Sequence, residues 1–422
     1  MVGTGHETSG NGHQRIVVTG VGVASPAGST VERFWAALLA ARSVAAPVQR
    51  VDVSEASIQF ACEASDFDPR PVLSEKQARR TDRFAQFTIV AADAALADAD
   101  RPELDGARVA TVIGNGLGGL ETVDHGAREF LGELGPGLRG RMNPLFVPTV
   151  MPNAGAAHIS MRYDFRGPCL TLSTACAAGA HAVGEGLRLL REGSADLVLA
   201  GGAEAPVTPS VLAAFGAAHA LSERSSDPAA ASRPFDQDRD GFVLAEGGAC
   251  LVLERRADAV ARGAPIRAEL LGYGRNTDAY HLVAPPPDGR GAVDCMRLAL
   301  DDAALGPGDV AHVNAHGTST PHNDAAEAVA LRTVFGDDGP PVTSVKGVLG
   351  HAIGGAGAIE AVASVLTISE GCIPPTANFE TPDAETASLD VVTEPRPLRA
   401  GAVMSNSFAF GGHNAVLLFG AP

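Results

Sequence analysis

The sequence predicts an α/β fold made of two similar halves. Buried-strand patterns alternate with amphipathic-helix patterns along most of the 422 residues, as in proteins whose helices pack on a largely parallel sheet. Five elements of the first part recur in the same order in the second part, which indicates an internal duplication. A strand, a sharp corner and a small-residue helix follow one another at 169–191, with a cysteine at the helix start. We therefore expect loops from the two halves to meet at one pseudo-symmetric site.

Composition and cysteine use narrow the class of protein. Hydrophobic residues make up 45% of the chain, enough for a sizeable core, and the net charge of −17 argues against nucleic-acid binding. No apolar run is long enough to span a membrane, so we expect no membrane association. Residues 1–14 are polar and glycine-rich, which predicts a flexible tail rather than a signal peptide. Six scattered cysteines without a CxxC pair fit a reducing cytoplasm.

The first half can be followed element by element. A buried strand at 15–24 precedes a helix around Trp35, and an amphipathic helix covers 83–98. A strand at 108–113 then leads through a glycine turn into a helix at 120–134. The turn spells GNGLGG, formally the GxGxxG of a dinucleotide fold. A nucleotide-binding unit needs a second parallel strand soon afterwards, but the following residues are rich in proline and glycine, so we favour a tight packing turn.

Cys176 is the candidate nucleophile. An apolar and β-branched run before it predicts a strand, and a helix is predicted from residues at helical spacing, namely Ala180, Val183, Leu187 and Leu190. A thiol in the first helical turn faces unpaired N–H groups and the positive end of the helix dipole, which favour the thiolate. The alternative is a small buried residue at a strand-to-helix junction.

The second half repeats the first beyond a boundary near 262–265, which predicts halves of 15–264 and 265–422. Strands at 195–200 and 248–254 complete the first half. The repeated segments pair as follows: 267–274 with 16–22, 309–316 with 108–114, 341–369 with the region of Cys176, and 402–408 and 414–419 with the strands at 195–200 and 248–254.

Three loops of the second half are rich in reactive side chains. One carries His316, another Lys346 and His351, and the last is the turn between two strands at 405–414. A cysteine nucleophile with two histidines suffices for acyl transfer through a thioester, provided that donors hold the oxyanion. The alternatives are structural histidines, a surface lysine, or a metal held by His316, His322 and Asp324, although their spacing matches no zinc motif.

Several separated motifs together resemble the β-ketoacyl-[acyl-carrier-protein] synthases of the thiolase-fold condensing enzymes, with the synthase II class nearest and polyketide ketosynthases next. The resemblance extends over 15–419. It rests on the three loops above and on VVTGVG at 17–22, TDRF at 81–84, GLGGL at 116–120, TAC at 174–176 and DRDGFV at 238–243. It implies a thiolase-like α/β fold of duplicated βαβαβαββ halves in a layered α-β-α-β-α architecture.

The resemblance also implies a mechanism. Cys176 would accept an acyl chain, with its own backbone N–H and that of Phe410 as the oxyanion hole. His316 and His351 would bind malonyl thioester and promote its decarboxylation, and Lys346 would support them. The family needs no metal or other cofactor, because its substrates travel on the phosphopantetheine arm of acyl carrier protein.

Further residues match family positions with supporting roles. Asp324 and Glu327 resemble the supporting carboxylates, Thr318 and Thr320 the residues that hold the pantetheine arm, and Leu117 a residue of the acyl pocket. Three positions depart from the family pattern: Ala409 replaces a glycine beside the gating phenylalanine, His219 a basic residue at the pocket mouth, and Val283 a frequent hydroxyl.

Partners follow from the resemblance and from local charge. The basic residues Lys76, Arg79 and Arg80 lie at a predicted helix start, where positive charge is unfavourable, and Arg139 and Arg141 form a second basic pair. With the resemblance we expect them to dock acyl carrier protein rather than to be a merely solvated surface. We expect a homodimer, or a heterodimer with a chain-length-factor homologue. A non-catalytic partner subunit is the remaining alternative, but such subunits lack the nucleophile.

Overall fold

The computed structural model describes residues 13–102, 105–135, 137, 139–140 and 142–422. Residues 1–12 of the expected tail and the proposed docking residue Arg141 therefore lie outside the described residues. In the described part of the chain, no helix is long and apolar enough to cross a membrane.

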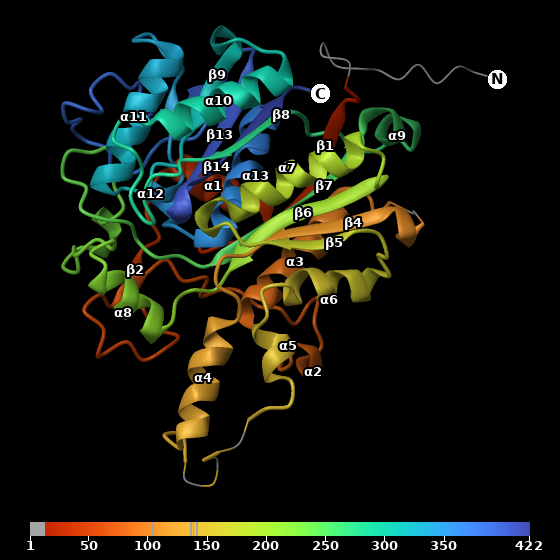
Figure 1. Cartoon of the computed structure of the whole chain (residues 1–422), viewed down its shortest axis with the longest axis vertical. Helices are drawn as coiled ribbons and strands as arrows, with labels where there is room; N and C mark the ends of the chain where they lie inside the picture. Colours follow the sequence, from red (N-terminus) through yellow and green to blue (C-terminus); the bar gives the residue numbers. More distant parts are fainter. Residues whose placement is uncertain (1–12, 103–104, 136, 138, 141) are drawn as a thin grey trace.

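Ten strands form the main sheet, which is mixed (Figure 1). Its order is β10-β9-β13-β14-β8-β1-β7-β6-β4-β5. Read outward from the centre, each half repeats one order, β1-β7-β6-β4-β5 and β8-β14-β13-β9-β10, as the sequence repeat predicts. The strands are β1 (Ile16–Ala24), β4 (Val109–Gly114), β5 (Cys169–Leu172), β6 (Leu197–Glu204), β7 (Gly247–Arg255), β8 (Ala268–Thr277), β9 (Val310–Asn314), β10 (Val342–Thr343), β13 (Ala402–Ala409) and β14 (His413–Gly420).

The two halves of the sheet are joined at the centre and separated by helices elsewhere. β1 and β8 pair antiparallel over only three residues, Ile16 to Val18. Helices α7 (Ala178–Arg191) and α13 (Ala356–Ser369) contact each other and strands of both halves. Outside them, α3 (Arg83–Asp98) packs on β1 and β7, and α10 (Arg290–Ala303) packs on β8 and β14. This arrangement is the α-β-α-β-α layering of a thiolase-like fold.

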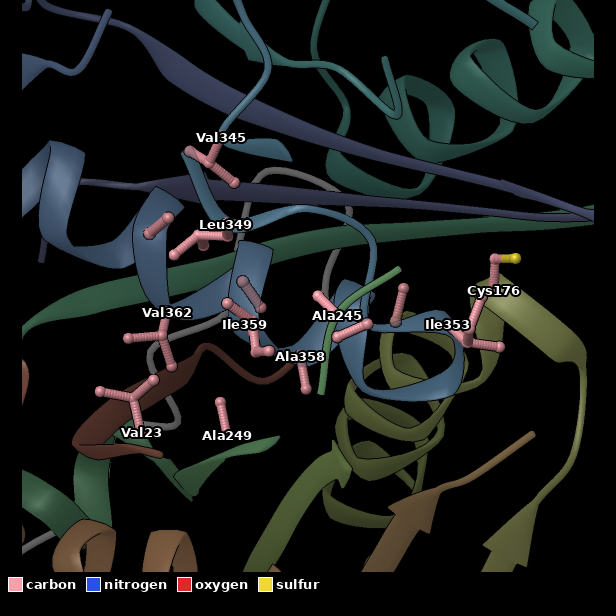
Figure 2. Close-up of a cluster of buried hydrophobic side chains, with 14 of the residues drawn as sticks. Val23, Cys176, Ala245, Ala249, Val345, Leu349, Ile353, Ala358, Ile359 and Val362 are labelled. Atoms are coloured by element: carbon pink, nitrogen blue, oxygen red, sulfur yellow. The ribbon is translucent and has the colours of Figure 1, made fainter. Parts of the chain in front are cut away.

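Small residues make the close packing possible. A Cβ at Gly22 in β1 would lie 2.1 Å from the carbonyl oxygen of Ala91 in α3. Between the central helices, a Cβ at Gly179 would lie 2.6 Å from the backbone nitrogen of Ala358. Real Cβ atoms are never so close to backbone, so α3 and the α7–α13 pair need glycine at these positions. The apolar core around α13 continues to Cys176 (Figure 2).

The remaining elements are short or peripheral. α4 and α5 extend away from the body of the molecule (Figure 1), and α4 ends before Gly132, whose φ of 81° terminates the helix earlier than expected. The other helices are α1 (Val31–Ala40), α2 (Glu75–Ala78), α4 (Leu120–Leu131), α5 (Phe146–Val150), α6 (Ala154–Tyr163), α8 (Pro209–Ala217), α9 (Arg256–Ala261), α11 (Pro321–Phe335) and α12 (Lys346–Leu349). Two small ladders pair β2 (Ala46–Pro47) with β3 (Phe60–Ala61) and β11 (Cys372–Ile373) with β12 (Arg396–Pro397).

Candidate active site

Cys176 lies in a short 3-10 turn between β5 and α7. The turn spans Ala175–Ala177, and Ala175 is left-handed with φ of 48°. The sequence predicted a helix that starts at the cysteine, but the α-helix starts at Ala178. Left-handed alanine is costly, and such strain persists only where surrounding contacts enforce it. Cys176 is 8% exposed, and its sulfur points away from the apolar cluster around α13 (Figure 2).

Cys176 is protonated in the structure, whereas the sequence analysis predicted that the thiolate is favoured. Burial raises the pKa of the thiol to about 12. The positive charge of Lys346 and the backbone N–H groups of Phe410 and Cys176 lower that pKa, but their effect is smaller than that of burial. The resting side chain is therefore a thiol at neutral pH, and the surrounding donors stabilise negative charge only once it forms.

Phe410 follows β13 and begins the turn to β14. Phe410 is 39% exposed, and its backbone N–H donates to the sulfur of Cys176. Ala409, just before it, is in an ordinary extended conformation with φ of −128°, so this state of the turn does not require glycine there. Gly411 and Gly412 carry the left-handed conformations, with φ of 80° and 73°.

His316 and His351 face each other beside the thiol. Their ring centroids are 5.4 Å apart with an interplanar angle of 86°, and both residues are buried. Burial, followed by the charge of Lys346, holds the pKa of both imidazoles well below the ordinary value of 6.5. Both rings are therefore neutral at neutral pH. Neither ring nitrogen of His351 has a hydrogen-bond partner among the described residues, which leaves its N–H available to a ligand.

Lys346 joins the histidine pair to the central helix. Its Nζ donates to the carbonyl oxygen of His316 at 2.7 Å, lies 3.4 Å from Nδ1 of the same histidine, and forms a buried ion pair with Glu360. Burial raises the pKa of Glu360 to about 7. The sequence analysis missed Glu360, although a lone carboxylate in the otherwise apolar helix α13 was a usable signal.

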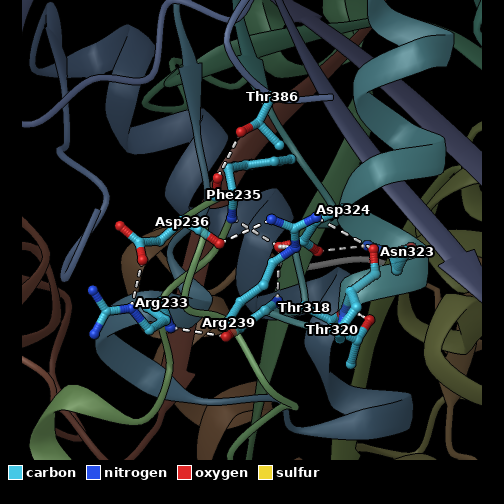
Figure 3. Close-up of polar contacts among 12 residues, drawn as sticks. Arg233, Phe235, Asp236, Arg239, Thr318, Thr320, Asn323, Asp324 and Thr386 are labelled. Carbon is cyan, nitrogen blue, oxygen red and sulfur yellow. Dashed lines mark hydrogen bonds and ion pairs between the residues drawn. The ribbon is translucent and has the colours of Figure 1, made fainter. Parts of the chain in front are cut away.

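Two carboxylates of α11 hold the loops around His316. Glu327 accepts hydrogen bonds from the backbone nitrogens of His316 at 2.9 Å and Gly317 at 2.8 Å. Asp324 accepts from the backbone nitrogens of Ser319 at 3.2 Å and Phe235 at 2.8 Å (Figure 3). Both side chains are buried, and their hydrogen bonds fix the backbone of these loops.

One cavity of about 360 Å³ brings most of the predicted residues together. Its lining includes the nucleophile, both histidines and many positions named from sequence, namely Leu117, His219, Val283, Thr318, Thr320, Glu327, Ala409 and Phe410. The hydroxyls of Thr318 and Thr320 are 2.8 Å apart at this cavity. His316, His322 and Asp324 do not form a cluster suited to a metal ion.

The proposed docking residues lie elsewhere on the surface. Lys76 is in α2, whose first turn is capped by Ser74, and Arg79 follows that helix with its side chain 75% exposed. Arg80 and Arg139 are also exposed, and none of these four residues lines the cavity. The structure thus separates a surface basic cluster from the buried chemistry.

Comparisons with known proteins identify the family of the chain. The family model described as "Beta-ketoacyl synthase, N-terminal domain" matches residues 13–259, and "Beta-ketoacyl synthase, C-terminal domain" matches residues 267–380. A 3-oxoacyl-[acyl-carrier-protein] synthase 2 from Synechocystis sp. is 42% identical over 411 residues, which cover 96% of this chain and 98% of the relative.

Solved structures match over both halves as well. The ishigamide ketosynthase/chain length factor has a TM-score of 0.91 at 36% identity, covering 97% of this chain and 100% of that one. A type II PKS acyl-carrier protein in complex with its ketosynthase, bound to the hexaketide, gives a TM-score of 0.86 at 31% identity with the same coverage.

Proposed function

The chain belongs to the β-ketoacyl synthase family, a family of acyltransferases, and from this premise we propose that it condenses an acyl chain on Cys176 with malonyl-acyl-carrier protein. The products are a β-ketoacyl-acyl-carrier protein and CO₂. The observation that carries the proposal is the single cavity in which a buried thiol, two neutral imidazoles and two backbone N–H groups meet. In this proposal the half at 15–264 supplies the nucleophile and the half at 265–422 supplies the histidines.

The first step is transfer of the acyl group to Cys176. The sulfur attacks the thioester carbonyl, and the backbone N–H groups of Cys176 and Phe410 hold the resulting oxyanion. Collapse of this intermediate expels the thiolate of the carrier's pantetheine, which takes up the proton that the thiol has lost. Phe410 is partly exposed at the pocket wall, so its ring can swing to admit the acyl chain.

The second step uses the histidine pair. Because Nζ of Lys346 is a protonated donor near Nδ1 of His316, Nδ1 acts as the acceptor and Nε2 carries the hydrogen. His351 has an N–H without a partner in the described structure. Two N–H donors can then hold the malonyl thioester oxygen while the carboxylate leaves as CO₂. The enolate carbon attacks the acyl thioester, and Cys176 departs as a thiolate that is reprotonated.

Other cavity residues support substrate binding. Thr318 and Thr320 present paired hydroxyls at the cavity, which suits the amides of a pantetheine arm. Leu117 supplies an apolar wall beside the thiol, which suits the acyl chain. The acyl carrier protein as donor is supported by the printed names of the relatives and by the solved carrier complex.

The pathway is proposed as fatty acid elongation, after the synthase II relatives at 42% identity. The second candidate is a polyketide ketosynthase that needs a chain-length-factor partner, and the specific observation in its favour is the 0.91 TM-score to such an assembly. A non-catalytic partner subunit is disfavoured because Cys176, His316 and His351 are all present and converge. All six cysteines are free thiols, which supports a reducing compartment such as the cytoplasm.

We propose a dimer through the edge of the sheet at β5. This strand is last in the sheet order, and Leu170 in it is 43% exposed. Further exposed apolar side chains belong to the neighbouring helices and loops, namely Met142, Leu145, Val147, Met151 and Met161. An unpaired edge with apolar neighbours is a template for another chain. The partner is a second copy or a chain-length-factor homologue.

One experiment tests the reaction and the assembly together. The purified chain is incubated with acyl-carrier proteins of graded acyl length, and intact-protein mass spectrometry records the adduct while native mass spectrometry records the oligomer. We expect an adduct on Cys176 and, after addition of malonyl-acyl-carrier protein, a β-ketoacyl product. Cys176→Ala is the matched control and should carry no adduct. An adduct on another cysteine contradicts the proposal, and activity only with an added cysteine-less homologue selects the polyketide alternative.

A further inference from the structure

The glycine turn after β4, formally a GxGxxG, wraps around a carboxylate of the protein itself. Glu204 is the last residue of β6 and is fully buried. Its Oε2 accepts from the backbone nitrogen of Gly116 at 2.7 Å, and its Oε1 accepts from that of Leu117 at 3.2 Å and from the side-chain amide of Asn115 at 2.8 Å. These N–H groups are the kind that a nucleotide-binding turn directs at phosphate, so here they are already occupied.

A fourth donor reaches the same carboxylate from the second half of the chain. The backbone nitrogen of Gly354 donates to Oε2 of Glu204 at 3.1 Å. In the described part of the chain, all hydrogen-bond partners of Glu204 are N–H groups and none is a cation. Four donors fill the acceptor capacity of two carboxylate oxygens, so the side chain is held entirely by loop backbone and one amide.

Gly354 is the counterpart of Cys176 in the duplicated fold. Ala175 opens the 3-10 turn before α7 with φ of 48°, and Ile353 opens the 3-10 turn before α13 with φ of 44°. Cys176 and Gly354 are the second residues of these turns. The N–H of Cys176 faces its sulfur, where negative charge develops, whereas the N–H of Gly354 donates to the carboxylate of Glu204, a group of the protein itself. A Cβ at Gly354 would lie 2.6 Å from Oε2 of Glu204.

The two loops that Glu204 ties together both form the cavity wall next to the nucleophile. Leu117 and Ile353 line the cavity with Cys176, and Glu204 itself does not line it. Ile353 is a β-branched residue with positive φ, a conformation that persists only under external restraint, and the adjacent Gly354 contact supplies one. We propose that Glu204 is a positioning residue that sets the shape of the acyl pocket by clamping the backbone behind Leu117 and Ile353.

This inference rests on the proposed acyl transfer, and it predicts a change in acyl-chain discrimination. Glu204→Gln keeps the shape of the side chain but places an NH₂ against N–H donors, which releases part of the clamp. The spread is the ratio of the fastest to the slowest rate of Cys176 loading among acyl-carrier proteins that carry chains from butyryl to palmitoyl. We expect this ratio to fall by about tenfold in the variant. If the Glu204→Gln variant does not fold, Glu204→Asp keeps the carboxyl group with both acceptor oxygens on a shorter stem and should narrow the spread of loading rates less.

A double-mutant cycle separates positioning from a general loss of structure. Leu117→Ala alone should also narrow the spread, and adding Glu204→Gln should produce little further change, because both act on one wall. Glu254→Gln is the matched control: Glu254 is a buried carboxylate in β7 that pairs with Arg262, so its loss should lower stability without changing the spread. If the wild type loads normally and the spread is unchanged in Glu204→Gln, the inference about Glu204 is overturned and the proposed function is not. Absence of loading in the wild type overturns the proposed function.

Discussion

At the scale of single residues, burial sets the protonation of the groups in the cavity. It raises the pKa of Cys176 to about 12 and that of Glu360 to about 7, and it lowers the pKa of His316 and His351. In each case burial shifts the pKa toward the neutral form, as expected when a charged form loses its hydration, although Glu360 still forms an ion pair with Lys346. The groups that develop charge during condensation therefore depend on aligned N–H donors rather than on solvent.

The histidine pair gives the first prediction. His316→Ala and His351→Ala should each lower condensation by about a hundredfold to a thousandfold, because each removes one donor to the enolate oxygen. Loading of Cys176 should persist, since the oxyanion of that step is held by backbone. The measurements are the rate of β-ketoacyl product formation and the mass of the acyl adduct. Loss of loading with retained malonyl decarboxylation would reverse the assigned roles.

The pH dependence of the same step follows from these pKa directions. Because both imidazoles titrate well below 6.5, lowering the pH from about 8 to about 6 leaves them neutral and able to donate from Nε2. We therefore expect no fall in the decarboxylation rate with an apparent pKa near that of free histidine.

His312 gives a second prediction, on stability. This residue of β9 is fully buried, neither ring nitrogen has a partner in the described structure, and burial lowers its pKa to about 3. As pH falls below 6.5 the unfolded chain binds a proton that the folded chain does not, so the free energy of unfolding decreases. His312→Leu removes this effect and should gain about 1.4 kcal/mol relative to wild type between about pH 8 and pH 5.5.

Thermal unfolding of both proteins across that pH range checks the prediction. The melting temperature of His312→Leu should exceed that of the wild type by a margin that grows as the pH falls. A margin that is constant with pH would mean that His312 is protonated in the folded protein or has a partner there.

At this scale, sequence reasoning could name residues that lie in a motif. Lys346 and Glu327 lie in sequence segments dense with polar groups, and the structure places both next to His316. Glu360 and Glu204 were missed because neither lies in a motif, and only the fold shows which groups their carboxylates contact. The prediction of a favoured thiolate at Cys176 was wrong, because a position at a helix start does not reveal how completely the thiol is buried.

At the scale of elements, strong hydrophobic periodicity predicted the helices reliably, but their first and last residues were predicted less accurately. The predicted helix at 83–98 has the same bounds as α3, whose apolar face is buried against β1 and β7. The helix predicted to reach 134 stops at Leu131, because Gly132 adopts a left-handed cap. The helix predicted at Cys176 starts later, because a 3-10 turn precedes it.

The turn after β13 gives the third prediction. Ala409 is unstrained in the present state of the turn, but alanine has fewer accessible conformations than glycine through which Phe410 could swing. Ala409→Gly should therefore speed loading of Cys176 or change its preference among acyl lengths. It should also lower stability by about 0.4–1 kcal/mol, because glycine gains freedom in the unfolded chain. Stopped-flow loading with several acyl lengths provides the measurement, and identical kinetics at every length would exclude a hinge here.

At the scale of the whole molecule, the duplication explains where the site lies. Each half presents its strands in the same order, so the turns before α7 and α13 come together beside the central helix pair. The sequence repeat predicted this order and the meeting of loops. It did not predict that the counterpart of the nucleophile turn would face the carboxylate of Glu204, since that contact joins residues 150 positions apart.

The last prediction concerns the acidic chain and its carrier. With a net charge of −17, the protein repels an acidic partner unless a local basic surface offsets the repulsion. Lys76, Arg79 and Arg80 supply such a surface, and the side chain of Arg79 is 75% exposed. Reversing Arg79 and Arg80 to Glu should slow loading from acyl-carrier protein by about tenfold and weaken its salt dependence, because rim charges govern encounter rates.

A small acyl donor distinguishes a loss of carrier-protein docking from a loss of the folded structure. Loading from an acyl-pantetheine, which needs no protein docking, should be unchanged in the Arg79→Glu, Arg80→Glu variant. The matched control reverses Arg297 and Arg399, which are exposed in the second half, and thus makes the same change in net charge at other places on the surface. If docking is local, this control loads from acyl-carrier protein faster than the Arg79→Glu, Arg80→Glu variant. Equal slowing in both would assign the effect to net charge, and loss of both donors would mean that the arginines hold the fold.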